Sequence, residues 1–136
     1  MISRTILPLV SLLLLGAILA GGALAGTSWI CSITEAVGVE EDGTVGVPDL
    51  GDLEQPTFFR VDAGTKKVTL LAPVSRAGEV TKIDVVHEEE GLWLFVGVEA
   101  NRSWSMVIED NGHLTLSITG DGATWSIFGS AMKEEK

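Results

Sequence analysis

The sequence predicts an all-β domain: an antiparallel meander of about eight strands that closes as a small up-and-down barrel. From Phe58 onward, short runs rich in β-branched and aromatic residues alternate with turn residues. The links between the later runs are only a few residues long, which favours antiparallel pairing because a parallel crossover needs about a dozen residues or more. Most runs also alternate apolar and polar side chains, as a sheet with one dry face requires.

Eight segments have the length and composition of strands. They are Ser28–Thr34, Thr57–Asp62, Lys66–Pro73, Thr81–Glu88, Leu92–Val98, Arg102–Glu109, His113–Thr119 and Ala123–Ser130. Such strands either close into a barrel or fold as a two-sheet β-sandwich. Closure removes the exposed edges of an open sheet, and eight is a common closing number, so the barrel is favoured.

Turn residues and alternation fix the expected connections and faces. Asn111-Gly112 and Asp121-Gly122 are pairs favoured in tight hairpins, and Gly64 and Gly78 can adopt positive φ in two earlier turns. The residues expected to face inward include Trp29, Cys31 and Ile33; Ile83 and Val85; Trp104, Met106 and Ile108; and Leu114, Leu116 and Ile118.

The first 25 residues predict a cleavable signal peptide. Arg4 precedes an apolar stretch from Ile6 to Ala20, and Ala23-Leu24-Ala25 offers the small residues that signal peptidase requires. We therefore expect residues 26–136 to be a single β domain that is periplasmic or secreted, with no stable membrane insertion after cleavage. The alternative is an uncut anchor in the inner membrane, because the apolar run is about long enough to span a bilayer.

Acidic residues dominate the charge of the chain. It has 19 acidic and 9 basic residues and a net charge of −10, so a nucleic acid partner is not expected. Between Ala36 and Pro56 the strand pattern lapses into Gly, Pro and acidic residues, which predicts an acidic loop at about residues 36–56. The spacing of its acids does not match a calcium-binding loop, and we expect no metal.

Residues that carry catalysis are few. The only histidines are His87 and His113, each beside a predicted turn, and no Gly-x-Ser-x-Gly or metalloprotease motif is present. We therefore expect no catalytic residue and no cofactor, and an enzyme is the least favoured function. Cys31 is the only cysteine, so no intramolecular disulfide forms; it is either a small buried hydrophobic residue, a reactive thiol or a partner in an intermolecular disulfide.

Aromatic side chains in the strands are the candidates for a ligand site. Trp93, Phe95, Trp104 and Trp125 either form the walls of an apolar site or fill the core. Arg60 shares a face with Asp62. If this face points into the barrel, the pair would orient a polar ligand; an outward surface ion pair is favoured, because burial of a charge is costly.

Three segments resemble blocks that recur in an uncharacterised family of small exported β proteins of proteobacteria. They are Thr57–Asp62, Arg102–Met106 and Gly112–Ser117. The resemblance covers most of the chain after the signal and implies an exported β domain without implying an activity. In that family a second cysteine often follows a Phe-Gly pair, whereas Phe128-Gly129 is followed here by Ser130.

Two functions are therefore expected ahead of catalysis. The first is an exported, non-enzymatic binding module that holds a small apolar molecule, or meets a partner protein, through the open end of the barrel and the acidic loop. The second is an acidic interaction protein, such as an inhibitor, that acts on a basic envelope protein, because complementary charge accelerates encounter.

Overall fold

The computed structural model describes residues 26–51 and 55–135, so the predicted signal peptide lies outside the described residues. The described strands are β1 (Ser28–Glu40), β2 (Val45–Gly46), β3 (Phe58–Asp62), β4 (Lys67–Ala72), β5 (Val80–Lys82), β6 (Val85–Glu89), β7 (Leu92–Glu99), β8 (Arg102–Ile108), β9 (His113–Gly120) and β10 (Ala123–Lys133). A single turn of 3-10 helix, η2 (Val74–Arg76), joins β4 to β5. No helix in the described ranges has the length and apolar character needed to cross a membrane.

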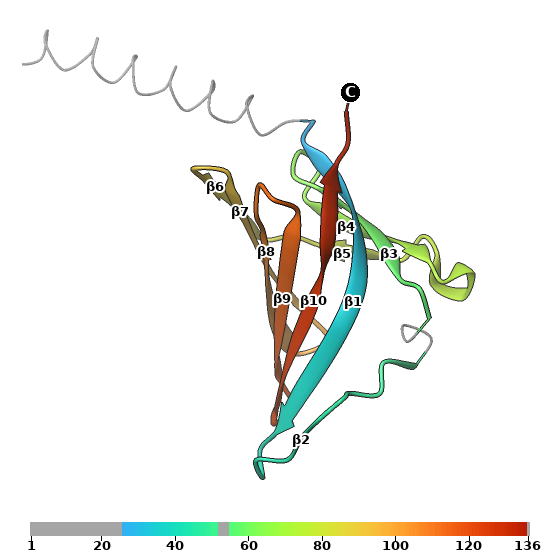
Figure 1. The fold of residues 1–136 in the computed structure, drawn as a ribbon, viewed down its shortest axis with the longest axis vertical. Helices are drawn as coiled ribbons and strands as arrows, with labels where there is room; N and C mark the ends of the chain where they lie inside the picture. The colour runs from blue at the N-terminus through green and yellow to red at the C-terminus, as the bar shows by residue number, and fades with distance from the viewer. Residues whose placement is uncertain (1–25, 52–54, 136) are drawn as a thin grey trace, which may run out of the picture.

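The strands form one antiparallel sheet that curls like a barrel (Figure 1). Its order is β5-β4-β3-β1-β10-β9-β8-β7-β6, and β2 pairs with β1 beside this path. Sequential strands are neighbours on both sides of β1, and the first long strand pairs with the last. The predicted all-β antiparallel meander is therefore confirmed.

The two edge strands, β5 and β6, are joined by a corner at Ile83 and Asp84. The N–H of Ile83 donates to the Lys66 carbonyl at 2.9 Å, whereas the N–H of Asp84 donates to the Val96 carbonyl at 2.8 Å. One residue therefore bonds to the β3–β4 side of the sheet and the next to β7. The corner brings the two edges of the curled sheet together.

Two predicted strands differ from those in the structure. One is divided by this corner, and the other, β1, is longer than expected. The segment Thr81–Glu88 is divided into β5 and β6, and the bend rotates Val85 outward: Ile83 is fully buried, but Val85 is 50% exposed. β1 continues to Glu40, since it pairs with β10 as far as Ala123. The predicted start of the acidic loop at residue 36 is therefore wrong.

A bulge in β1 lets this long strand follow the curl of the sheet. Ile33 pairs with Gly129 and Glu35 with Phe128, which leaves Thr34 as an extra residue. The Thr34 hydroxyl donates to the Phe128 carbonyl at 3.1 Å. A bulge of this kind bends and twists a strand, as closure of a sheet requires.

The predicted hairpins form, with one change in the residue that carries positive φ. Asp121 and Gly122 have φ values of 54° and 71° between β9 and β10, as a two-residue hairpin demands. Gly112 and Gly78 also have positive φ. In the turn after β3, however, Lys66 rather than Gly64 has it, at 57°.

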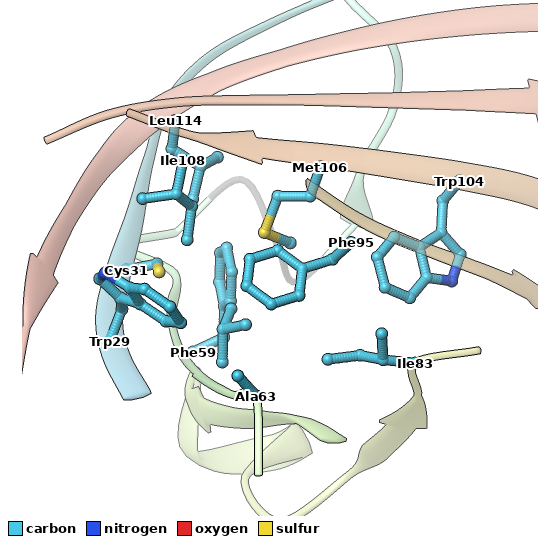
Figure 2. Packing of buried hydrophobic residues seen from close by; sticks show 11 residues of the cluster. Trp29, Cys31, Phe59, Ala63, Ile83, Phe95, Trp104, Met106, Ile108 and Leu114 are labelled. Atoms are coloured by element: carbon cyan, nitrogen blue, oxygen red, sulfur yellow. The ribbon is translucent and has the colours of Figure 1, made fainter. Parts of the chain in front are cut away.

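One end of the barrel is filled by a hydrophobic core (Figure 2). The buried cluster consists of Trp29, Cys31, Phe59, Val61, Ala63, Ile83, Phe95, Trp104, Met106, Ile108 and Leu114. Trp29 packs edge-on against Trp93, with ring centroids 4.8 Å apart, and against Phe95 at 5.5 Å. Edge-to-face aromatic packing of this kind contributes about 1 kcal/mol per pair beyond the burial of area.

The pairing of β1 with β10 makes Gly129 a sensitive position. A Cβ atom at Gly129 would collide with the backbone carbonyl oxygen of Ser32, whereas a Cβ at Gly46 would meet nothing within 4 Å. We expect Gly129→Ala to lower the free energy of unfolding by about 3 kcal/mol, because backbone cannot move aside as a flexible side chain can. Gly46→Ala, the matched control, should change it by less than about 0.5 kcal/mol.

Urea unfolding of the two variants, followed by circular dichroism, measures this difference. Equal stability of Gly129→Ala and Gly46→Ala would contradict the close approach of β1 and β10.

Candidate functional site

The other end of the barrel contains an open cavity of about 620 Å³. Its walls are mainly apolar and are formed by Ile33, Phe59, Val68, Leu70, Trp104, Met106, Leu116, Ile118, Trp125 and Ile127. It opens where η2 precedes β5 and where β7 turns into β8, since Arg76, Glu79, Glu99 and Arg102 also line it. The volume lies within the range of small-molecule sites, about 300–1,000 Å³.

Unequal strand lengths explain why this end is hollow. β1 pairs with β3 only from Ser28 to Ser32, but with β10 as far as Glu40. The wall made by β1, β10, β9 and β8 therefore continues past the point where β3 ends. Fewer side chains face this part of the wall from the opposite side, so the interior is not filled.

A row of paired residues crosses the cavity wall. Gly38 of β1 is paired with Trp125, Trp125 with Ile118, Ile118 with Trp104, and Trp104 with Gly97 of β7. Each indole thus lies next to a glycine. A Cβ atom at Gly38 would be 2.8 Å from Trp125 Cδ1, and one at Gly97 would be 2.6 Å from Trp104 Cε2, so only glycine leaves room for these rings.

Below this row, the floor of the cavity is apolar. Ile127, Leu116 and Met106 follow one another across β10, β9 and β8, and Met106 is paired in turn with Phe95 of the core in β7. Ile127 and Met106 are buried, and Leu116 is half-buried. The floor is therefore continuous with the core that fills the closed end.

Charged side chains at the mouth are held in pairs. Arg102 Nε lies 3.1 Å from Asp121 Oδ2, and its guanidinium lies over the Trp125 ring, with Cζ 4.4 Å from the centroid. Arg76 Nε donates to Glu79 Oε2 at 2.7 Å. The Thr81 hydroxyl donates to Glu99 Oε2 at 2.7 Å, which links β5 to the end of β7. These contacts place a polar rim around an apolar interior.

The structure separates the residues that the sequence proposed for ligand binding. Trp104 and Trp125 both line the cavity. Phe95 is fully buried in the core, and Trp93 lines a small hollow of about 80 Å³ at the closed end, beside Trp29. Two of the four aromatic candidates are thus brought together at the cavity, and two are not.

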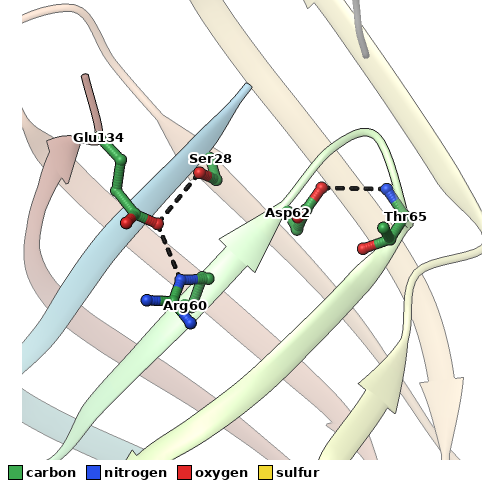
Figure 3. A network of polar contacts seen from close by, with 5 residues as sticks. All are labelled: Ser28, Arg60, Asp62, Thr65 and Glu134. Atoms are coloured by element: carbon green, nitrogen blue, oxygen red, sulfur yellow. Dashed lines mark hydrogen bonds and ion pairs between the residues drawn. The ribbon is translucent and has the colours of Figure 1, made fainter. Parts of the chain in front are cut away.

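Arg60 points away from the barrel interior. Phe59 and Val61 are buried, so Arg60 between them lies on the outer face, with its side chain 43% exposed. Its Nε lies 2.8 Å from Glu134 Oε1, which also accepts the Ser28 hydroxyl at 3.0 Å (Figure 3). The outward orientation agrees with the sequence analysis, but the partner is Glu134 rather than Asp62. Asp62 instead accepts the Thr65 N–H at 3.0 Å.

Sequence reasoning missed the rim of the cavity. Arg76 and Glu79 come from the β4–β5 connection, and Glu99 and Arg102 come from the β7–β8 turn; these two segments meet only in the curled sheet. Alternation gave a partial signal, because Arg102 precedes Trp104 by two residues and therefore shares its face. No local pattern relates Arg76 and Glu79 to the β7–β8 turn.

The histidines lie apart from the cavity. The side chains of His87 and His113 are both more than half exposed, and neither lines it. In the described ranges, no three His, Cys, Asp or Glu side chains are grouped so that they could hold a metal ion.

In the predicted acidic loop, the Asp42 carboxylate accepts a hydrogen bond from the Thr44 N–H at 2.8 Å. The hydrogen bonds with Thr44 lower the pKa of the Asp42 carboxyl.

Comparison with known proteins adds no functional assignment. No known protein family matches this chain, and a search of curated proteins finds no significant relative. The resemblance to small exported proteobacterial proteins therefore stays a prediction.

Cys31 is buried deep in the core and is 1% exposed. Burial raises the pKa of its thiol to about 12, so the native side chain stays protonated at neutral pH. A thiolate is the nucleophilic form of cysteine, and the native thiol therefore has neither access nor charge. This environment favours the small hydrophobic role over a reactive thiol.

We expect an aromatic disulfide reagent at about pH 8 to label native Cys31 at least about a hundredfold more slowly than the urea-unfolded chain, because labelling requires opening of the core. Release of the coloured thiol measures both rates, and Cys31→Ala supplies the blank. Rapid labelling of the native protein would show that Cys31 is accessible after all.

Proposed function

We propose that the protein is an exported, non-enzymatic binding protein that holds a small apolar molecule in the open end of its barrel. The observation that carries this proposal is the cavity of about 620 Å³ with apolar walls and two indoles at its mouth. Burial of apolar area supplies the affinity, at about 25 cal/mol per Å² removed from water before the costs of association.

The division of the barrel interior supports a ligand site rather than an incompletely packed core. The closed end is filled by the part of the buried cluster around Trp29 and Phe95, whereas Phe59, Trp104 and Met106 of the same cluster line the cavity. The open end is lined by residues such as Leu70, Leu116 and Ile118, which are only half-buried. A ligand that covers these side chains would complete the burial that the fold leaves unfinished.

The geometry also supports binding without chemistry. The charged groups at the rim, Arg76 with Glu79 and Arg102 with Asp121, are paired with each other in the surface layer. General acid–base catalysis needs a titratable group within reach of the reacting atoms. The apolar floor formed by Met106, Leu116 and Ile127 offers none.

A bulkier residue in the cavity tests this function. We expect wild-type protein to bind the neutral dye Nile red with a rise in dye emission, and Leu116→Trp to weaken this binding by about tenfold, equivalent to about 1.4 kcal/mol. The larger side chain occupies space that the dye needs. Phe128→Trp is the matched control, because Phe128 lies on the outer face of β10 and is 43% exposed; its affinity should stay that of the wild type.

Thermal unfolding of both variants checks that they fold. The proposal fails if wild-type protein does not bind the dye, or if folded Leu116→Trp and Phe128→Trp bind it equally well.

A further inference from the structure

The indole N–H of Trp104 has no hydrogen-bond partner, although the residue is more than nine-tenths buried. The residue is 8% exposed, and Nε1 is the one buried side-chain nitrogen or oxygen in the described ranges without a partner. Leaving a buried donor unsatisfied costs about 1–3 kcal/mol. Buried polar groups are nearly always paired, so an orphan of this kind calls for an explanation.

The position of this N–H relates it to the cavity. Trp104 lines the cavity, and Figure 2 shows its nitrogen on the side of the ring away from Phe95 and Met106. The nitrogen edge of the ring packs against Gly97, because a Cβ atom at this glycine would be 2.7 Å from Nε1. Glycine has no side chain that could accept the hydrogen bond. Nε1 itself has almost no accessible surface, so a partner in the cavity that Trp104 lines reaches the N–H only when the ring turns away from Gly97.

The charges around the mouth decide what kind of acceptor fits. The mouth has two positive groups, Arg76 and Arg102, and three negative ones, the carboxylates of Glu79, Glu99 and Asp121. Each arginine is already held by a carboxylate of its own, at 2.7 Å and 3.1 Å. An anionic ligand would therefore meet an excess of negative charge, in a chain whose net charge is −10. An uncharged oxygen avoids this repulsion.

We propose that the ligand is an apolar molecule with an uncharged carbonyl group, whose oxygen accepts the Trp104 indole N–H next to Arg102; this inference rests on the proposed binding function. The apolar body lies on Leu116, Ile118 and Leu70, and the carbonyl lies at the level of the two tryptophans. A small rotation of the Trp104 ring away from Gly97 turns its N–H toward this oxygen. The hydrogen bond satisfies the donor that the protein alone leaves unpaired.

Three ligands that share a naphthalene body separate this inference from apolar binding in general. They are acetylnaphthalene, ethylnaphthalene and the naphthoate anion, all substituted at the same ring carbon. Calorimetry with the full domain should show that acetylnaphthalene binds about fivefold to tenfold more tightly than ethylnaphthalene, the gain from one hydrogen bond to a buried donor. Naphthoate should bind more weakly than acetylnaphthalene.

Trp104→Phe should abolish the preference for the ketone over the hydrocarbon. Trp93→Phe is the matched control: it removes an indole at the closed end and should leave the preference intact. Proton–nitrogen correlation spectra give a readout on the unmodified protein, in which the indole signal missing from Trp104→Phe should move downfield with acetylnaphthalene and stay in place with ethylnaphthalene.

The outcomes separate the two proposals. Equal affinity for ketone and hydrocarbon, with no downfield shift of the Trp104 signal, overturns the carbonyl assignment and leaves apolar binding standing. Tightest binding of naphthoate overturns the preference for an uncharged acceptor. Failure of all three ligands, together with failure of Nile red, overturns both proposals.

Discussion

The pairing of β1 with β10 is the interaction on which the rest of the structure depends. It joins the first long strand to the last, from Trp29 opposite Lys133 to Glu40 opposite Ala123, and so turns a linear meander into a curled, barrel-like sheet. Without it, β1, β3, β4 and β5 would form one small sheet and β6 to β10 another. The bulge at Thr34 and the absence of a side chain at Gly129 allow two such long strands to stay paired while they bend.

The same pairing creates both the core and the cavity. At the start of β1, Trp29 and Cys31 face Phe59, Val61 and the aromatic residues of β7, and the interior is filled. Beyond Ser32, β3 no longer accompanies β1, and the inward side chains of β10, β9 and β8 face open space. A stable closed end thus supports an end that stays hollow. The packed half of the domain supplies the folding free energy. The other half can therefore contain a hollow with partly exposed apolar walls without unfolding the protein.

Glycines and tryptophans at the mouth illustrate how backbone sterics shape a site. Gly38 and Gly97 lie at the two ends of the paired row. Because neither has a side chain, the indole of the neighbouring strand packs directly over its backbone. The rings therefore lie along the wall instead of filling the interior. Trp125 is further held by the Arg102 guanidinium, whereas the Trp104 N–H is left without a partner in the described part of the protein. The two indoles are alike in sequence context and differ in what surrounds them.

The amino-acid sequence by itself determined the fold class, most strands and most faces. Alternation in segments such as Trp104–Ile108 and His113–Thr119, with Asp121-Gly122 between the last two strands, is a local signal that survives in the structure because hairpin pairing is also local. Only the tertiary structure decided where β1 ends, how Ile83 and Asp84 form a corner, and that Arg60 meets Glu134. It also decided that Trp104 and Trp125 line a cavity while Phe95 fills the core. These outcomes depend on which residues meet across the curled sheet, and pairings between distant strands leave no periodic trace in either strand.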